Sequence, residues 1–180
     1  MNETPVTEMI ENTTYDEIQI GHMARMSRQL TISDIQAFAA VSGDTNPAHL
    51  DADYANDTVF HGVIAHGMWS GALISALLGT EFPGPGTIYT NQDLHFIRPV
   101  RIGDTLTVTV TVKSKEDLKK HLTLDCEVIN QHGEKVVTGT AVVIAPTQKV
   151  KRPRSIAPHI QLFDPEARFN ALLARGNTLE

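Results

Sequence analysis

The 180-residue sequence predicts a single α+β domain in which an antiparallel sheet wraps around one long central helix. Two observations support this prediction. Between His66 and Thr80, apolar side chains are spread around almost the whole helical circumference, which is typical of a helix buried on nearly all sides. From Ile88 onward, segments with the period-two alternation of strands follow one another, and the connections between them are too short for crossover helices. We therefore expect antiparallel neighbours.

The first elements precede the central helix. We interpret residues 1–19 as an N-terminal leader, whose first 14 residues show little periodicity and are predicted to be mobile. Met23–Leu30 is compatible with a first strand. Ser33-Asp34-Ile35-Gln36 has the form of a capping box with Ser33 as the N-cap, and it predicts a helix that ends at Gly43.

A short loop is predicted after this helix. Gly43–Pro47 consists of turn formers, and Pro47 disfavours helical angles at Asn46. The sequence therefore predicts a fixed loop here, followed by the helix from His66 to Thr80.

The second half of the chain is predicted to be a sheet. Thr105–Val112 alternates threonine with leucine or valine without error, the pattern of a strand with one buried face. Together with the segments before and after it, this strand predicts an antiparallel meander in chain order, formed by Ile88–Ile97, Thr105–Val112, Leu122–Val128 and Val136–Ile144. The helix and the sheet thus lie within a domain spanning residues 20–146.

The pattern stops after Pro146. Residues 147–180 are interpreted as a proline-broken linker or tail that connects to a second domain outside this chain. Within it, Lys149–Arg154 is basic, and Pro165–Arg175 is compatible with a short helix. A single six-residue basic run is a weak signal for nucleic-acid binding, so a solvated tail is the favoured interpretation.

Charge excludes some classes of partner. The chain has 15 Lys and Arg against 21 Asp and Glu, a formal charge of −6 at pH 7. Residues 1–148 hold 9 basic and 18 acidic residues (net −9), whereas residues 149–180 hold 6 and 3 (net +3). A body this acidic is a poor candidate for binding nucleic acid or an anionic membrane.

Cysteine and histidine usage argues against disulfides and metals. The single cysteine, Cys126, excludes an intrachain disulfide and is consistent with a reducing cytoplasm. Met1–Ile20 contains no Lys or Arg, unlike a signal or transit peptide, and Met68–Leu78 is too short to span a bilayer. Neither cysteine nor the histidine spacing forms a metal motif. We therefore predict a cytoplasmic protein with no metal and no cofactor.

One segment carries most of the chemical information. In Gly43–His49, a carboxylate (Asp44) and an imidazole (His49) lie five residues apart across a proline-stiffened turn. Such a pair can hold and deprotonate a water molecule. Taken alone, Asp44 is equally well explained as a turn cap, and His49 is more often a structural histidine. Spacing by itself does not decide between these roles.

The motif Gly43-Asp44-x-Asn46-Pro47-x-His49, followed by His66-Gly67-Met68, resembles the MaoC-like (R)-specific enoyl-CoA hydratases, or hydratase 2 family. The resemblance implies a hot dog fold, usually as a homodimer or higher oligomer. It also implies (R)-specific hydration of trans-2-enoyl-CoA to (R)-3-hydroxyacyl-CoA, with an acyl-CoA as the small-molecule partner.

The resemblance also assigns roles to residues. Asp44 and His49 match the catalytic pair that holds the attacking water, and Gly67 matches the position whose backbone N–H binds the thioester oxygen. Asn46 matches the motif asparagine of the substrate site and is expected to brace the loop. Ser75 matches a position lining the acyl pocket, although a small residue chosen for helix packing is an equally good interpretation.

Other interpretations stay open at this stage. A hot dog thioesterase shares the fold and the substrate class. A non-catalytic acyl-CoA-binding module is suggested by a resemblance to the N-terminal part of bifunctional enoyl-CoA hydratase/phosphate acetyltransferases, in which an acyltransferase domain would follow. Four lysines near one hairpin are candidates for binding the CoA phosphates: Lys113, Lys115, Lys119 and Lys120.

Overall fold

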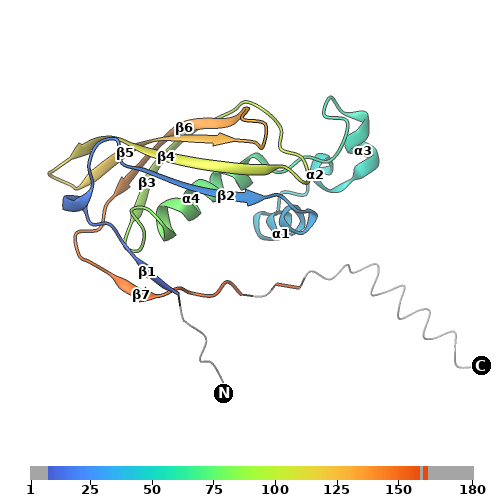
Figure 1. Ribbon diagram of the computed structural model, residues 1–180. Helices are drawn as coiled ribbons and strands as arrows, with labels where there is room; N and C mark the ends of the chain where they lie inside the picture. The colour runs from blue at the N-terminus through green and yellow to red at the C-terminus, as the bar shows by residue number, and fades with distance from the viewer. Residues whose placement is uncertain (1–7, 159, 162–180) are drawn as a thin grey trace, which may run out of the picture.

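The computed structural model describes residues 8–158 and 160–161, in which a five-stranded antiparallel sheet packs against one long helix, α4 (Figure 1). The helix spans Gly67–Thr80. The strands, in sheet order β2-β4-β5-β6-β3, are β2 (Met23–Gln29), β4 (Thr105–Glu116), β5 (His121–Ile129), β6 (Lys135–Ile144) and β3 (Ile88–Phe96). The α+β hot dog class predicted from the sequence is confirmed.

The core lies between α4 and the inner face of the sheet. On β4 the apolar members of the alternation, Leu106, Val108, Val110 and Val112, are at most 1% exposed, whereas the intervening threonines are only half-buried. Ile74 and Leu77 of α4 pack in the same core and are fully buried. Burying side chains of this size supplies about 1.5–3 kcal/mol each before entropy is counted.

The meander prediction is correct for β4, β5 and β6 but wrong for β3. β3 pairs with β6 and not with β4, and β2 takes the place beside β4. Residues 97–104 connect β3 to β4, which lie three strand positions apart in the sheet. This distance is about 15 Å, and eight residues are long enough to span it. Hydrophobic alternation identifies strands and their buried faces, but it contains no information about which strand lies beside which.

Two details of the helices also differ from the prediction. Helix α1 (Ile32–Ser42) is N-capped by Thr31, not Ser33, and Thr31 forms the capping box with Asp34. Gly43 ends it in the left-handed region, at φ 75°, as predicted. In α4, Met68 is 55% exposed and Ser75 is also exposed, so this helix is not buried on all sides within one chain.

Both chain ends contain a strand that the sequence did not predict. β1 (Met9–Glu11) pairs antiparallel with β7 (Lys151–Pro153), and the short 3-10 helix η1 (Tyr15–Glu17) follows β1. The prediction that residues 1–14 are mobile is therefore wrong for Met9–Glu11, and the basic run contains a paired strand. The possible helix Pro165–Arg175 lies outside the described residues. We call residues 8–17 and 146–154 together the terminal strap.

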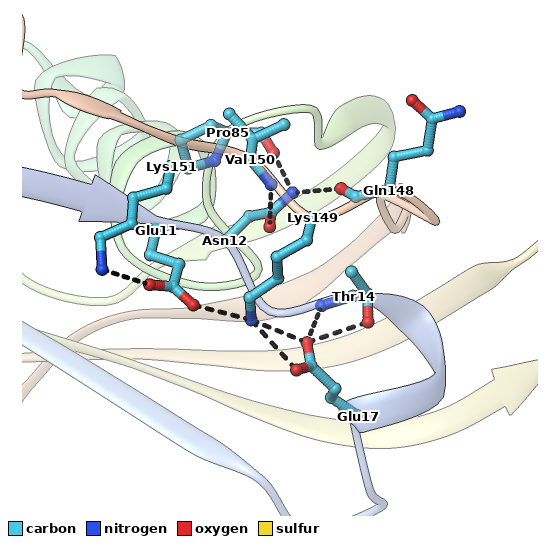
Figure 2. A network of polar contacts seen from close by, with 9 residues as sticks. All are labelled: Glu11, Asn12, Thr14, Glu17, Pro85, Gln148, Lys149, Val150 and Lys151. Carbon is cyan, nitrogen blue, oxygen red and sulfur yellow. Dashed lines mark hydrogen bonds and ion pairs between the residues drawn. The ribbon is translucent and has the colours of Figure 1, made fainter.

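Asn12 holds the terminal strap together (Figure 2). Its side chain is 1% exposed; Nδ2 donates to the carbonyls of Pro85 and Gln148, and Oδ1 accepts from Val150 N–H, each at 2.9 Å. Both N–H groups and the oxygen of the Asn12 side chain therefore have hydrogen-bond partners. Through Pro85, Asn12 also connects the terminal strap to the turn that follows α4.

Charged side chains surround this contact. Lys149 Nζ lies 3.3 Å from Glu11 and 3.0 Å from Glu17, as Figure 2 shows. A hydrogen bond from the Thr14 backbone N–H, together with Lys149, lowers the pKa of Glu17 to about 2. Because the folded pKa lies below the ordinary 4.5, the stabilisation is present above about pH 4.5 and is lost as the pH falls towards 2.

No helix in the described part of the chain is both long enough and apolar enough to cross a membrane.

Replacing Asn12 should open the terminal strap. Asn12→Ala removes three part-buried hydrogen bonds to the main chain of Pro85, Gln148 and Val150, which costs about 1–3 kcal/mol. We expect the free energy for opening, measured by amide hydrogen exchange at Asn12 and Arg154, to fall by this amount. Lys149→Ala is the control: it removes only exposed ion pairs and should change the opening free energy by less than about 1 kcal/mol. Equal effects of the two substitutions would contradict the assigned role of Asn12.

Candidate functional site

The predicted motif forms a tight loop between α1 and the short helix α2 (Pro47–Leu50). Ser42 Oγ accepts from Asp44 N–H at 3.2 Å, and Asp44 Oδ1 accepts from Asn46 N–H at 3.2 Å. Asn46 is the N-cap of α2, because its Oδ1 accepts from Ala48 N–H at 3.0 Å. With Pro47 at the first helical position, these contacts fix the main chain on both sides of the Asp44 carboxylate.

His49 is fixed by the main chain of a neighbouring segment. It lies in α2, is 9% exposed, and its Nδ1 is 2.8 Å from the carbonyl oxygen of Ile64. Because a carbonyl only accepts, Nδ1 must carry the proton, and the neutral ring then has an unprotonated Nε2. A histidine held in this tautomer can accept a proton at Nε2.

Asp44, His49 and His66 converge. One side-chain oxygen or nitrogen from each of these residues lies within 4.8 Å of the other two. Among the described residues, this is the group whose donors, two imidazoles and a carboxylate, could also hold a metal ion. One nitrogen of each histidine already contacts a main-chain carbonyl, Ile64 for His49 and Asp44 for His66. That the protein binds no metal stays a prediction.

Gly67 lies beside this group at the first position of α4, after the N-cap His66. The N–H groups in the first turn of a helix have no intrahelical acceptor and carry the positive end of the helix dipole. A Cβ at Gly67 would lie 3.2 Å from the Phe96 ring, so glycine lets this ring pack closely against the start of α4. The helix terminus can therefore bind an oxygen that carries negative charge.

A cavity of about 310 Å³ lies beside His49 and Gly67. Ser70 and Arg98 also line it, and most of the remaining lining is apolar, including Phe96, Val100, Val136 and Val137. Ser70, one turn into α4, has no sequence signal that points to a role in the site. Its Oγ and the Nδ1 of His66 are buried and have no hydrogen-bond partner among the described residues. Because Ser70 lines the cavity, its unpaired Oγ favours a ligand that supplies the missing contact.

Ser75 lies outside this cavity. It lines a second hollow of about 270 Å³ on the exposed side of α4, together with Phe38, Met68 and Leu94. Phe38 also packs against the His66 ring, with centroids 5.1 Å apart, so one side chain borders both the second hollow and the group around Asp44. The structure thus brings Asp44, Asn46, His49 and Gly67 together and places Ser75 in an adjacent apolar space.

The lysine cluster does not belong to this site. Lys115 donates to the carbonyls of Tyr15 and Ile18, Lys120 lies 4.6 Å from the centre of the Tyr15 ring, and Lys113 pairs with Asp125 at 3.1 Å. The hairpin that carries these lysines lies at the opposite end of the sheet from α2 (Figure 1). Arg98, in contrast, lines the cavity. Arg98 could not be predicted for the site from the sequence, because a single arginine after a strand gives no signal.

The fold and this site define a class of protein: a hot dog protein in which a histidine and a helix N-terminus line one cavity and a carboxylate lies beside that histidine. The model of the MaoC like domain matches residues 16–135, and the chain belongs to this family. It is 48% identical over 136 residues to an (R)-specific enoyl-CoA hydratase of Rhodospirillum rubrum, covering 74% of this chain and 92% of the relative.

Two further relatives agree with this assignment. A 3-hydroxybutyryl-CoA dehydratase of Methylorubrum extorquens is 37% identical, covering 77% of this chain and 88% of the relative. The unliganded structure of the R-hydratase PhaJ1 from Pseudomonas aeruginosa is 45% identical and superposes with a TM-score of 0.83, covering 87% of this chain and all of that one. The chain is therefore an enzyme of the hydratase and dehydratase (carbon–oxygen lyase) class.

Proposed function

We propose that this enzyme hydrates trans-2-enoyl-CoA to (R)-3-hydroxyacyl-CoA. The observation that carries the proposal is the convergence of the Asp44 carboxylate and the unprotonated Nε2 of His49 beside the N-terminus of α4. The substrate class is supported by the relatives, which are named for enoyl-CoA hydration and 3-hydroxybutyryl-CoA dehydration.

The site can perform each step of this addition. A water held between Asp44 and His49 attacks C3 of the enoyl thioester with its oxygen, and one of the two side chains accepts its proton. The electron pair of the C2–C3 double bond moves to C2 and the thioester oxygen, where the Gly67 N–H stabilises the enolate. A preorganised donor of this kind contributes about 3–4 kcal/mol in the transition state. The proton taken from the water is then passed on to C2 through the pair, so that the elements of water are added across the double bond without an oxidant or cofactor.

Loss of either side chain should abolish turnover. With crotonyl-CoA as substrate, decay of the conjugated thioester absorbance should fall by about 10²–10⁴-fold for Asp44→Asn and His49→Ala, because each removes a proton-transfer group. Asp53→Asn is a matched control, since this exposed carboxylate lies on the adjacent helix α3 (Ala52–Asp57). An inactive wild type, or undiminished turnover in the two variants, would refute the proposal.

The same reaction mixture separates the alternatives. Release of free CoA, detected with a thiol reagent, would indicate a thioesterase. Binding of acyl-CoA without any turnover would indicate the non-catalytic module of a fused enzyme. Chiral analysis of the 3-hydroxybutyryl product tests the (R) configuration independently of the rate.

We further propose that the hollow around Ser75 receives the acyl chain. Its lining is almost entirely apolar, and Phe38 connects it to the group around Asp44. Ser75→Leu would replace the hydroxyl with three carbon atoms of apolar bulk in this hollow. We expect kcat/KM for octenoyl-CoA relative to crotonyl-CoA to fall about 10-fold or more, because lost space affects the longer chain selectively. Gly79→Ala, where an added Cβ meets nothing within 4 Å, should leave the ratio unchanged. An unchanged ratio in Ser75→Leu would refute this placement.

We propose that the enzyme is a homodimer or a higher homo-oligomer. β3 is an edge strand of the main sheet, and it leaves Ile88 57% and Phe96 52% exposed, beside the exposed Met68 of α4. An apolar edge of this kind favours pairing with a second copy.

Light scattering tests this assembly. We expect a mass of at least about 39 kDa, twice the 19.7 kDa of one chain. Ile88→Glu should shift the protein towards 19.7 kDa, because it places a charge on the exposed edge strand. Leu118→Glu, on the distant hairpin and 87% exposed, is the control. A monomeric wild type would contradict the proposal.

A further inference from the structure

His66 makes contacts that the proposed reaction does not use directly. It is the N-cap of α4 and only 2% exposed, but its side chain does not cap that helix. Instead, Nε2 lies 2.9 Å from the main-chain carbonyl oxygen of Asp44. The imidazole therefore connects the first residue of the central helix to the loop that carries the carboxylate, 22 positions earlier in the chain.

The same ring is packed on two sides. Its centroid lies 3.9 Å from the His49 ring, with an angle of 33° between the planes, and 5.1 Å from the Phe38 ring. His66 thus contacts α1 through Phe38, α2 through His49 and the loop through Asp44. A single side chain fixes the distance and orientation of both members of the pair relative to the N-terminus of α4.

The hydrogen bond also determines the tautomer of His66. Because the Asp44 carbonyl only accepts, Nε2 must carry a proton, and Nδ1 of the neutral ring does not. The adjacent histidines are therefore held in opposite tautomers. His49 has its proton on Nδ1 and a free Nε2, whereas His66 uses its Nε2 proton to hold the main chain.

We propose that His66 is a positioning residue for the hydration reaction: its Nε2–H holds the Asp44 main chain, and its ring fixes the plane of the His49 imidazole. This inference rests on the proposed function and extends it. Displacement of a reacting group by about 1 Å can cost about 100-fold in rate, so loss of these contacts should lower kcat. Substrate contacts with the Gly67 N–H and the apolar cavity do not involve His66, so KM should change little.

Three substitutions separate the hydrogen bond from the packing. His66→Gln keeps an N–H donor at nearly the reach of Nε2 but removes the ring. His66→Phe keeps a ring but removes the donor, and His66→Ala removes both. We expect kcat to fall about 100-fold or more in His66→Ala and about 30–100-fold in His66→Phe, with KM within about 3-fold of wild type. His66→Gln should recover at least about 10-fold over His66→Ala. His132→Gln, an exposed histidine between β5 and β6, should behave as wild type.

Amide hydrogen exchange tests the role of His66 independently of the activity assay. The amide protons of Asn46 and Ala48 report on the loop, since both donate to its side chains. Their exchange with deuterium, followed by NMR, should be at least about 10-fold faster in His66→Phe than in wild type and close to wild type in His66→Gln. If wild type does not hydrate crotonyl-CoA but these exchange rates follow the prediction, the proposed function fails and the positional role of His66 stands.

Two results would overturn the inference. One is a kcat in His66→Phe and His66→Ala equal to that of wild type. The other is a loss in His66→Gln as large as that in His66→Ala, with unchanged exchange at Asn46 and Ala48, because the donor to Asp44 would then have no role. A mainly structural role would lower thermal stability in all three variants without the recovery expected for His66→Gln.

Discussion

The N-terminus of α4 is the constraint on which the rest of this site depends. A helix with its core-facing side chains fully buried cannot shift without losing packing, so its first N–H groups are held at a fixed point of the cavity wall. Gly67 lines the cavity at that point, and His66 directly before it connects the helix to the Asp44 loop. The carboxylate and the imidazole are thus positioned relative to the same rigid element that supplies the anion-binding N–H.

The side chains of the candidate site are held in place by main-chain contacts more than by ion pairs. Carbonyl oxygens of Ile64 and Asp44 set the tautomers of two adjacent histidines, and an N-cap amide holds the loop. Neutral hydrogen bonds of this kind do not weaken with salt as exposed ion pairs do. The terminal strap is different: its buried Asn12 is surrounded by exposed ion pairs such as Lys149 with Glu17, and it lies away from the cavity.

Much of the fold could be predicted because its determinants are local. The alternation of residue types in β4 predicts which of its side chains are buried, and Gly43 predicts where α1 ends. Both features depend on backbone geometry within a few residues. The order of β3 in the sheet, the pairing of β1 with β7 and the choice of Thr31 as N-cap were missed. The first two depend on contacts between distant segments, and the third on a competition between two similar capping sequences.

The sequence by itself determined the fold class, the family and the short motif that contains Asp44 and His49, because residue type and local spacing define these features. Only the tertiary structure decided which groups share a cavity. It placed His66 against both members of the pair, Arg98 and Ser70 in the cavity wall, Ser75 in an adjacent hollow, and the lysine hairpin at the far end of the sheet. The physical reason is that proximity across 22 or more residues is set by packing of the whole core.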